Sequence, residues 1–119
     1  MSRVLLVEDE FLVAMHIEDM LVDLGYKVVG PVSRLEDALK LVHSGEPIDA
    51  ALLDVNLAGE RSWPVARALR DRGIPFLFAT GYIELHASRP DDLDGTAILP
   101  KPLQEIHLAQ ALKALLSSA

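Results

Sequence analysis

Three short apolar runs in this chain each lead directly into polar groups, and this pattern limits the possible folds more than any other feature. The runs and the groups that follow them are 4–7 with Glu8-Asp9-Glu10, 50–53 with Asp54, and 97–99 with Lys101-Pro102. Uninterrupted apolar runs of this length are typical of strands that are buried on both faces of a parallel sheet. Because the carboxyl ends of parallel strands lie along one edge of the sheet, the polar groups are predicted to meet there.

Helical patterns alternate with the strands along the whole chain. Strands are predicted at 3–7, 27–32, 49–53, 74–79 and 96–99, and helices at 11–24, from Ser33 onward, at 62–72 and at 103–116. The second helix is predicted to open with a capping box formed by Ser33 and Glu36. Between Tyr82 and Gly95 the pattern weakens, so any helix there is expected to be short.

This alternation predicts an α/β fold. Five strands with helical crossovers give a doubly wound five-stranded parallel sheet with helices on both faces. The common strand order for this flavodoxin-like arrangement is 2-1-3-4-5, which places the first and third strands side by side. Glu8 and Asp9 would then face Asp54 across the crevice between these strands.

Composition excludes several classes of function. The 119 residues, half of them hydrophobic, suit one domain. There are 18 acidic residues against 11 basic ones, giving a formal net charge of -7, which argues against a nucleic-acid partner. The absence of cysteine excludes thiolate chemistry, and no apolar stretch is long enough to span a membrane. We therefore expect a soluble, cytoplasmic protein.

Taken in order, these motifs resemble a two-component response regulator receiver domain. The resemblance rests on Val4 to Glu10, Leu53-Asp54, Thr80 and Lys101-Pro102, and it covers essentially the whole length. It implies a single receiver domain over residues 1–119, with no effector domain. Such a chain is expected to be a phosphorylation-activated switch rather than an enzyme that turns over a substrate.

The resemblance also implies a role for each site residue. Asp54 would be the phosphoacceptor. Asp9 and Asp54 would ligate Mg2+ directly, with Mn2+ able to replace it, while Asn56 would offer its main-chain carbonyl and Glu8 would act through water. These are the hard oxygen ligands that magnesium prefers. Lys101 would pair with the acyl phosphate, and Thr80 would donate its hydroxyl to a phosphoryl oxygen.

One stretch narrows the resemblance further. Residues 75–82 resemble the F-A-T-G-Y signature of the single-domain FAT-GUY receivers. Ile98 stands three residues before Lys101, where the wider family usually has an aromatic switch residue. We therefore expect Thr80, Gly81 and Tyr82 to form the switch. A second departure is Leu57-Ala58-Gly59, which replaces the Pro-Gly pair that often follows the acceptor.

The expected partners are proteins. A sensor histidine kinase or a histidine phosphotransfer protein would donate the phosphoryl group, and output would come from contact with a downstream protein or from onward transfer. Phe11, Met15 and Val22 form a second apolar stripe on the first helix. We favour packing against the last helix, or modest exposure, as its explanation over a kinase or dimer surface. The chain is expected to be a monomer or a weak homodimer.

Two other readings of the same residues stay open. Asp54-Val55-Asn56 after a buried strand could belong to a phosphatase of the aspartyl-phosphate type, although that class normally has a second acid where Asn56 stands. The chain could also be a degenerate receiver that binds partners constitutively. The presence of Glu8, Asp54 and Lys101 together argues against that alternative.

Overall fold

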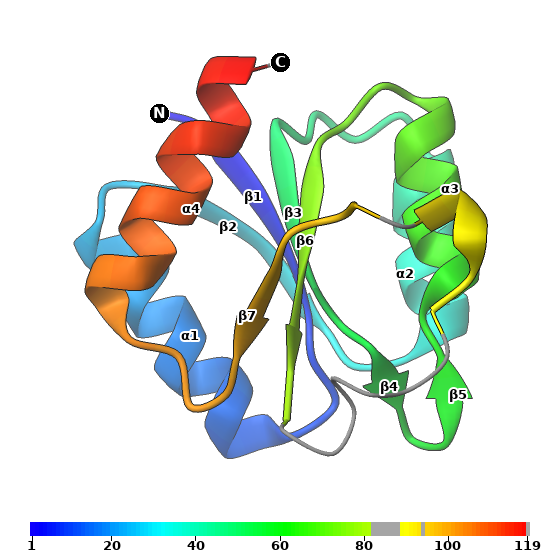
Figure 1. The fold of residues 1–119 in the computed structure, drawn as a ribbon, viewed down its shortest axis with the longest axis horizontal. Helices are drawn as coiled ribbons and strands as arrows, with labels where there is room; N and C mark the ends of the chain where they lie inside the picture. Colours follow the sequence, from blue (N-terminus) through cyan, green and yellow to red (C-terminus); the bar gives the residue numbers. More distant parts are fainter. Residues whose placement is uncertain (82–88, 94, 119) are drawn as a thin grey trace.

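The computed structural model describes residues 1–81, 89–93 and 95–118, and these form a parallel sheet between two layers of helices (Figure 1). The sheet order is β2-β1-β3-β6-β7, which confirms the predicted 2-1-3-4-5 arrangement because β4 and β5 pair only with each other. The strands are β1 (Arg3–Val7), β2 (Lys27–Val32), β3 (Ala50–Asp54), β4 (Asn56–Leu57), β5 (Glu60–Arg61), β6 (Phe76–Thr80) and β7 (Ile98–Pro100).

The helices cover the sheet in two pairs. Helices α1 (Phe11–Asp23) and α4 (Glu105–Ser118) lie on one face, and α2 (Leu35–His43) and α3 (Trp63–Asp71) lie on the other. No helix in the described part of the chain has the length and apolar character that a bilayer crossing requires.

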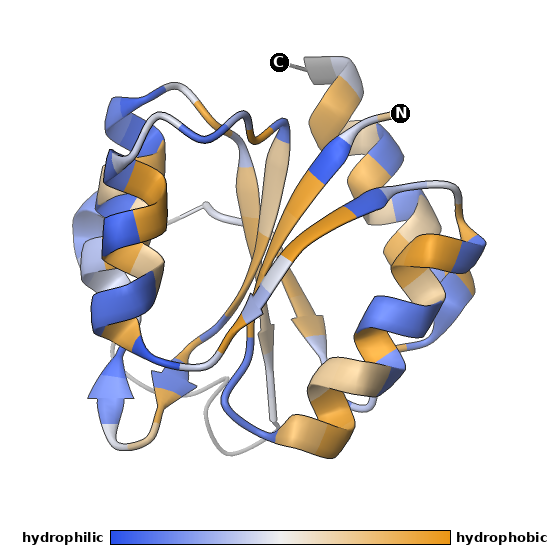
Figure 2. Ribbon diagram, turned by 180° about the vertical axis from the view of Figure 1, so that it is seen from behind, coloured by the Kyte–Doolittle hydropathy of each residue, from blue (hydrophilic) through white to orange (hydrophobic). Residues whose placement is uncertain are grey.

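The apolar strand runs exist because the sheet is buried on both faces. Successive side chains of a strand point to opposite faces, and accordingly Leu5 and Val7 of β1 join the core under α2 and α3, while Val4 and Leu6 join the core under α1 and α4. All five residues of β3 are buried. Figure 2 shows the central strands as predominantly hydrophobic and the helices as a mixture of polar and hydrophobic residues. A strand with two core faces cannot alternate polar and apolar residues.

Several predicted boundaries shift by one or two residues. The third strand includes Asp54 rather than ending before it, and the fourth runs over 76–80 instead of 74–79. The fifth begins at Ile98, two residues later than predicted, and the last helix begins at Glu105 rather than Leu103. The shift of the third and fourth strands toward their carboxyl ends makes Asp54 and Thr80 the last residues of those strands.

The predicted capping box at Ser33 is wrong. The N-cap of α2 is Arg34, whose backbone is extended and whose side chain makes no capping hydrogen bond. The Arg34 carbonyl accepts the first helical hydrogen bond, from the N–H of Ala38. Ser33 therefore lies one residue too early to cap this helix. The predicted third helix is confirmed, since Ser62 is its N-cap and Pro64 lies in its first turn.

The sequence pattern is weak between Tyr82 and Gly95, and the structure describes only part of this region. Within it the structure shows a short 3-10 helix, η2 (Asp91–Leu93), whose Leu93 is buried among the residues under α2 and α3. The Asp92 carboxylate accepts hydrogen bonds from Arg67 Nε at 3.0 Å and Arg70 Nη1 at 2.9 Å, both on α3. Hydrogen bonding to Arg67 and then Arg70 lowers the pKa of Asp92 to about 2. The described end of this region is thus fastened to α3.

Strand β2 contains a bulge beside the end of β1. Leu5 pairs with Val29 and Val7 with Val32, so two residues of β2, Gly30 and Pro31, stand opposite one of β1. Pro31 is tolerated because β2 is an edge strand. A Cβ on Gly30, whose φ is +99°, would lie 2.8 Å from Val32 N and 3.0 Å from Leu6 O.

We expect Gly30→Ala to destabilise the fold more than Gly25→Ala. Gly25 also has a positive φ of +91°, but a Cβ there would meet nothing within 4 Å. Gly25→Ala should therefore cost only the left-handed backbone penalty of about 1–2 kcal/mol, whereas Gly30→Ala should add about 1–3 kcal/mol of overpacking. Urea unfolding of both variants measures the difference, and equal losses would contradict the close approach at Gly30.

Candidate functional site

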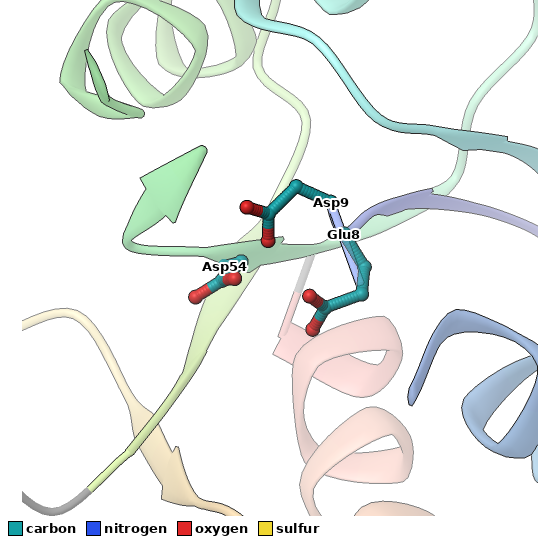
Figure 3. Close-up of side chains that lie close together, drawn as sticks. All are labelled: Glu8, Asp9 and Asp54. Carbon is teal, nitrogen blue, oxygen red and sulfur yellow. The ribbon is translucent and has the colours of Figure 1, made fainter. Parts of the chain in front are cut away.

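Three carboxylates meet where β1 and β3 end (Figure 3). Val7 pairs with Leu53 in the parallel register, which places Glu8 and Asp9 beside Asp54. One oxygen from each of these three side chains lies within 4.8 Å of the other two. The grouping predicted from sequence is therefore present in the folded chain.

Lys101 joins this group from the loop between β7 and α4. Its ammonium lies 2.5 Å from Glu8 Oε1 and 3.3 Å from Asp54 Oδ2. The Lys101 main-chain N–H donates to Thr80 O at 2.8 Å, so the loop is also fixed to the end of β6. The Glu8 and Asp54 side chains are only 1% and 5% exposed, whereas that of Lys101 is 17% exposed. A buried carboxylate pair with a shared counter-ion results.

Main-chain amides orient each carboxylate. The N–H of Glu10 donates to Glu8 Oε2 at 3.1 Å, and that of Asn56 makes a longer contact of 3.4 Å with Asp54 Oδ1. The N–H of Ala58 donates to Asp9 Oδ2 at 3.0 Å. Hydrogen bonds to a charged acceptor are stronger than those between neutral groups. A main-chain amide thus contacts one oxygen of each side chain, and Lys101 contacts the second oxygen of Glu8 and of Asp54.

The amides of Asn56 and Ala58 belong to a small hairpin that the sequence reading missed. Strands β4 and β5 pair antiparallel around a two-residue turn, Ala58-Gly59, in which both residues have positive φ, 51° and 90°. Such turns usually show Asn-Gly or Asp-Gly in the sequence. Alanine in the first turn position costs about 1–2 kcal/mol of backbone strain and removes the signal by which the hairpin could have been found.

Burial and charge shift the proton affinities of the site. Burial, followed by the charge of Glu8, raises the pKa of Asp54 to about 8, although Lys101 acts in the opposite direction. For Lys101 burial works to lower the pKa, but hydrogen bonding to Glu8 and the charge of Asp54 outweigh it and raise the pKa. For Asp9 burial works to raise the pKa, but hydrogen bonds, led by that from Ala58, lower it overall.

The predicted switch residues are partly described. Thr80 is fully buried at the end of β6, one residue after Ala79, which pairs with Asp54. Gly81 follows it and is half-buried, whereas Tyr82 lies outside the described residues. Ile98, in the place of the expected aromatic residue, pairs with Phe78 and packs half-buried against the core under α2 and α3.

The family model for the response regulator receiver domain matches residues 4–113. The chain belongs to this family. It is a receiver domain of two-component signalling, with a flavodoxin-like fold.

Curated relatives of this receiver are response regulators and related regulatory proteins. It is 28% identical over 115 residues to the phyllosphere-induced regulator PhyR of Methylorubrum extorquens, covering 93% of the chain and 42% of PhyR. It is 30% identical to the sensory transduction protein LytT of Bacillus subtilis, covering 95% of the chain and 47% of LytT. The receiver thus spans less than half the length of these two relatives.

Solved structures include relatives of matching length. SdrG from Sphingomonas melonis Fr1 is 46% identical, with a TM-score of 0.84 and coverage of 98% of this chain and 97% of that one. The receiver domain of a sensor histidine kinase from Pseudomonas aeruginosa, solved with a magnesium ion in its active-site cleft, is 27% identical, with a TM-score of 0.82 and 98% of both chains covered.

We expect Asp54→Asn to stabilise the receiver increasingly as the pH rises from 5 to 8 in the presence of a chelator. The ordinary pKa of an aspartate is 3.8 and that of folded Asp54 is about 8, so between these values the folded state holds more protons than the unfolded state. Stability from this residue is then lost as the pH rises. Thermal or urea unfolding measures the free energy of unfolding of both proteins. The difference between Asp54→Asn and the wild type should grow by at least ~1 kcal/mol from pH 5 to pH 8.

Asp49→Asn is the control for that experiment. Asp49 accepts a hydrogen bond from the Arg3 amide and is exposed to solvent, and it immediately precedes β3, at the opposite end of that strand from Asp54. If the free energies of unfolding of the wild type and of Asp54→Asn differ by the same amount from pH 5 to 8, the raised pKa of Asp54 is contradicted.

Proposed function

We propose that this receiver accepts a phosphoryl group on Asp54 and thereby switches its contacts with other proteins. The observation that carries the proposal is the position of Asp54, held between the carboxylates of Glu8 and Asp9 and the ammonium of Lys101. A carboxylate oxygen of Asp54 would form a bond to phosphorus while the bond from phosphorus to a histidine nitrogen of the donor breaks. Such transfers need positioning and charge compensation more than covalent chemistry.

The residues present fit a magnesium ion. Three carboxylate oxygens within 4.8 Å of one another are hard ligands of the type that Mg2+ takes. We assign Asp9 and Asp54 as direct ligands, Glu8 as a ligand through water, and the main-chain carbonyl of Asn56 as a further ligand. Bound there, the ion would neutralise charge that develops on the transferred phosphoryl oxygens.

Lys101 and Thr80 would respond to the added group. Before phosphorylation the Lys101 ammonium contacts Asp54 directly at 3.3 Å, so it is already placed to pair with a phosphoryl oxygen on that residue. Thr80 ends the strand beside Asp54 and is fully buried, and its carbonyl holds the Lys101 amide. A hydroxyl bond from Thr80 to the phosphoryl group would transmit the modification to Gly81 and Tyr82.

The donor would approach beside α1. A groove of about 410 Å³ extends from Lys101 along this helix and is lined mainly by apolar residues, among them Leu12, Ile17 and Leu103. Phe11 and Leu12 are 74% and 78% exposed next to it. Because a donor histidine must reach Asp54, we assign this face to a histidine kinase or phosphotransfer protein. Output through a further protein contact remains part of the proposal.

Acetyl phosphate with Mg2+ should add one phosphoryl group to the wild type and none to Asp54→Asn. The carboxylate of Asp54 is the nucleophile, and asparagine cannot replace it. Intact-protein mass spectrometry measures the product. Asp49→Asn, which changes the residue before the same strand, serves as the matched control and should be labelled like the wild type.

The same experiment separates the alternatives. Rapid repeated hydrolysis of acetyl phosphate would indicate a phosphatase, and an unmodified wild type would indicate a degenerate receiver. Either outcome would overturn the proposed function.

Leu12→Asp should slow phosphotransfer from a protein donor at least about tenfold and leave labelling by acetyl phosphate unchanged. An acidic side chain in the first turn suits the helix dipole, so α1 should stay intact, but a buried charge in the interface would oppose docking. Phosphotransfer from each purified histidine kinase and phosphotransfer protein of the host provides the measurement.

Val22→Asp is the control for docking. Val22 is 61% exposed near the other end of α1. Equal effects of the two substitutions, or none from Leu12→Asp, would exclude the groove as the donor surface.

A further inference from the structure

The β4–β5 hairpin turns its main chain toward the carboxylates. Leu57 and Glu60 are the pair that flanks the turn, and the N–H of Ser62 donates to the carbonyl of Val55 at 2.9 Å. In an antiparallel ladder, hydrogen-bonded pairs alternate with pairs that are not hydrogen-bonded. Asn56, which stands opposite Arg61 between those two pairs, therefore directs its N–H and C=O away from β5. Its N–H faces Asp54 Oδ1.

Ala58 continues the same side of the hairpin. Its N–H reaches Asp9 Oδ2 at 3.0 Å across a separation of 49 residues. Ala58 and Gly59 are both exposed, so neither turn residue packs in the core, although Leu57 before them does. The bond to Asp9 therefore links the exposed turn itself to the end of β1.

We propose that the Ala58 main-chain N–H is a positioning group for the metal site. It holds one oxygen of Asp9 and so leaves the other directed toward the cation, while the Asn56 N–H contacts one oxygen of Asp54, whose other oxygen faces Lys101. This inference rests on the proposed use of Mg2+. A proline at position 58 has no N–H and could not make the bond, which gives a physical meaning to the Leu57-Ala58-Gly59 departure in this chain.

The positioning role differs from a purely structural role in what it affects. A structural turn would influence stability and leave the affinity for Mg2+ unchanged. A positioning bond acts on a half-buried carboxylate that is a direct ligand, and loss of such a partner typically weakens metal affinity by about 10- to 100-fold. The affinity and the stability can be measured separately.

The test replaces a single N–H. In a semisynthetic protein, residue 58 is changed to L-lactic acid, which substitutes an ester oxygen for the amide and keeps the methyl side chain. The matched control places glycolic acid at residue 59, one residue further along the same turn. Mg2+ affinity is measured by NMR titration, and the unfolding midpoint is measured by thermal denaturation.

We expect the ester at residue 58 to weaken Mg2+ binding at least about tenfold and the ester at residue 59 to bind like the wild type. Equal affinity of the two ester proteins would overturn the inference. If the wild type itself does not bind Mg2+, the proposed function fails and the positioning role fails with it.

Hydrogen exchange tests the bond without any metal. In the Mg2+-free wild type, the Ala58 amide should exchange more slowly than the Gly59 amide, although both residues are exposed. Asp9→Ala should remove this difference by removing the acceptor. Equal exchange of the two amides in the wild type would overturn the inference whatever the metal affinity is.

Discussion

The site depends on one electrostatic constraint: carboxylates of like charge are gathered in a place from which water is largely excluded. Glu8 and Asp54 are almost fully buried, and such a pair is unfavourable unless a cation or a proton neutralises it. Lys101 supplies one positive charge to both, yet burial and the charge of Glu8 still raise the pKa of Asp54 to about 8. Electrostatics therefore favour the binding of a further positive charge at the unphosphorylated site.

Much of the architecture can be predicted from the sequence, because a strand that is buried on both faces is an uninterrupted apolar run. The runs ending at Val7 and Leu53 had to be strands inside a covered sheet, and the polar residues after them had to share its edge. The strand order and the meeting of Glu8, Asp9 and Asp54 were predictable for this reason. The strand boundaries were less predictable, because pairing with Ala79 of β6 makes Asp54 part of β3.

What the sequence could not reveal comes from main-chain geometry. The β4–β5 hairpin carries an alanine where an asparagine would have announced the turn, and the capping box at Ser33 failed because the backbone of Arg34 takes the cap position. In the first case the local sequence signal is missing, and in the second it is present but the fold does not follow it. The amides that orient Asp9 and Asp54 have no side-chain signature at all, so no reading of residue types could have located them.

The fastening of Asp92 to α3 has a mechanical consequence. Two arginines on α3 hold this carboxylate, and Leu93 beside it is buried in the core that this helix covers, so polar and apolar contacts both tie residues 91–93 to α3. Helix α3 also begins directly after the hairpin that contacts Asp9 and Asp54. Helix α3 thus joins the hairpin beside the acid cluster to η2, and this series of contacts between the site and residues 91–93 does not include Thr80.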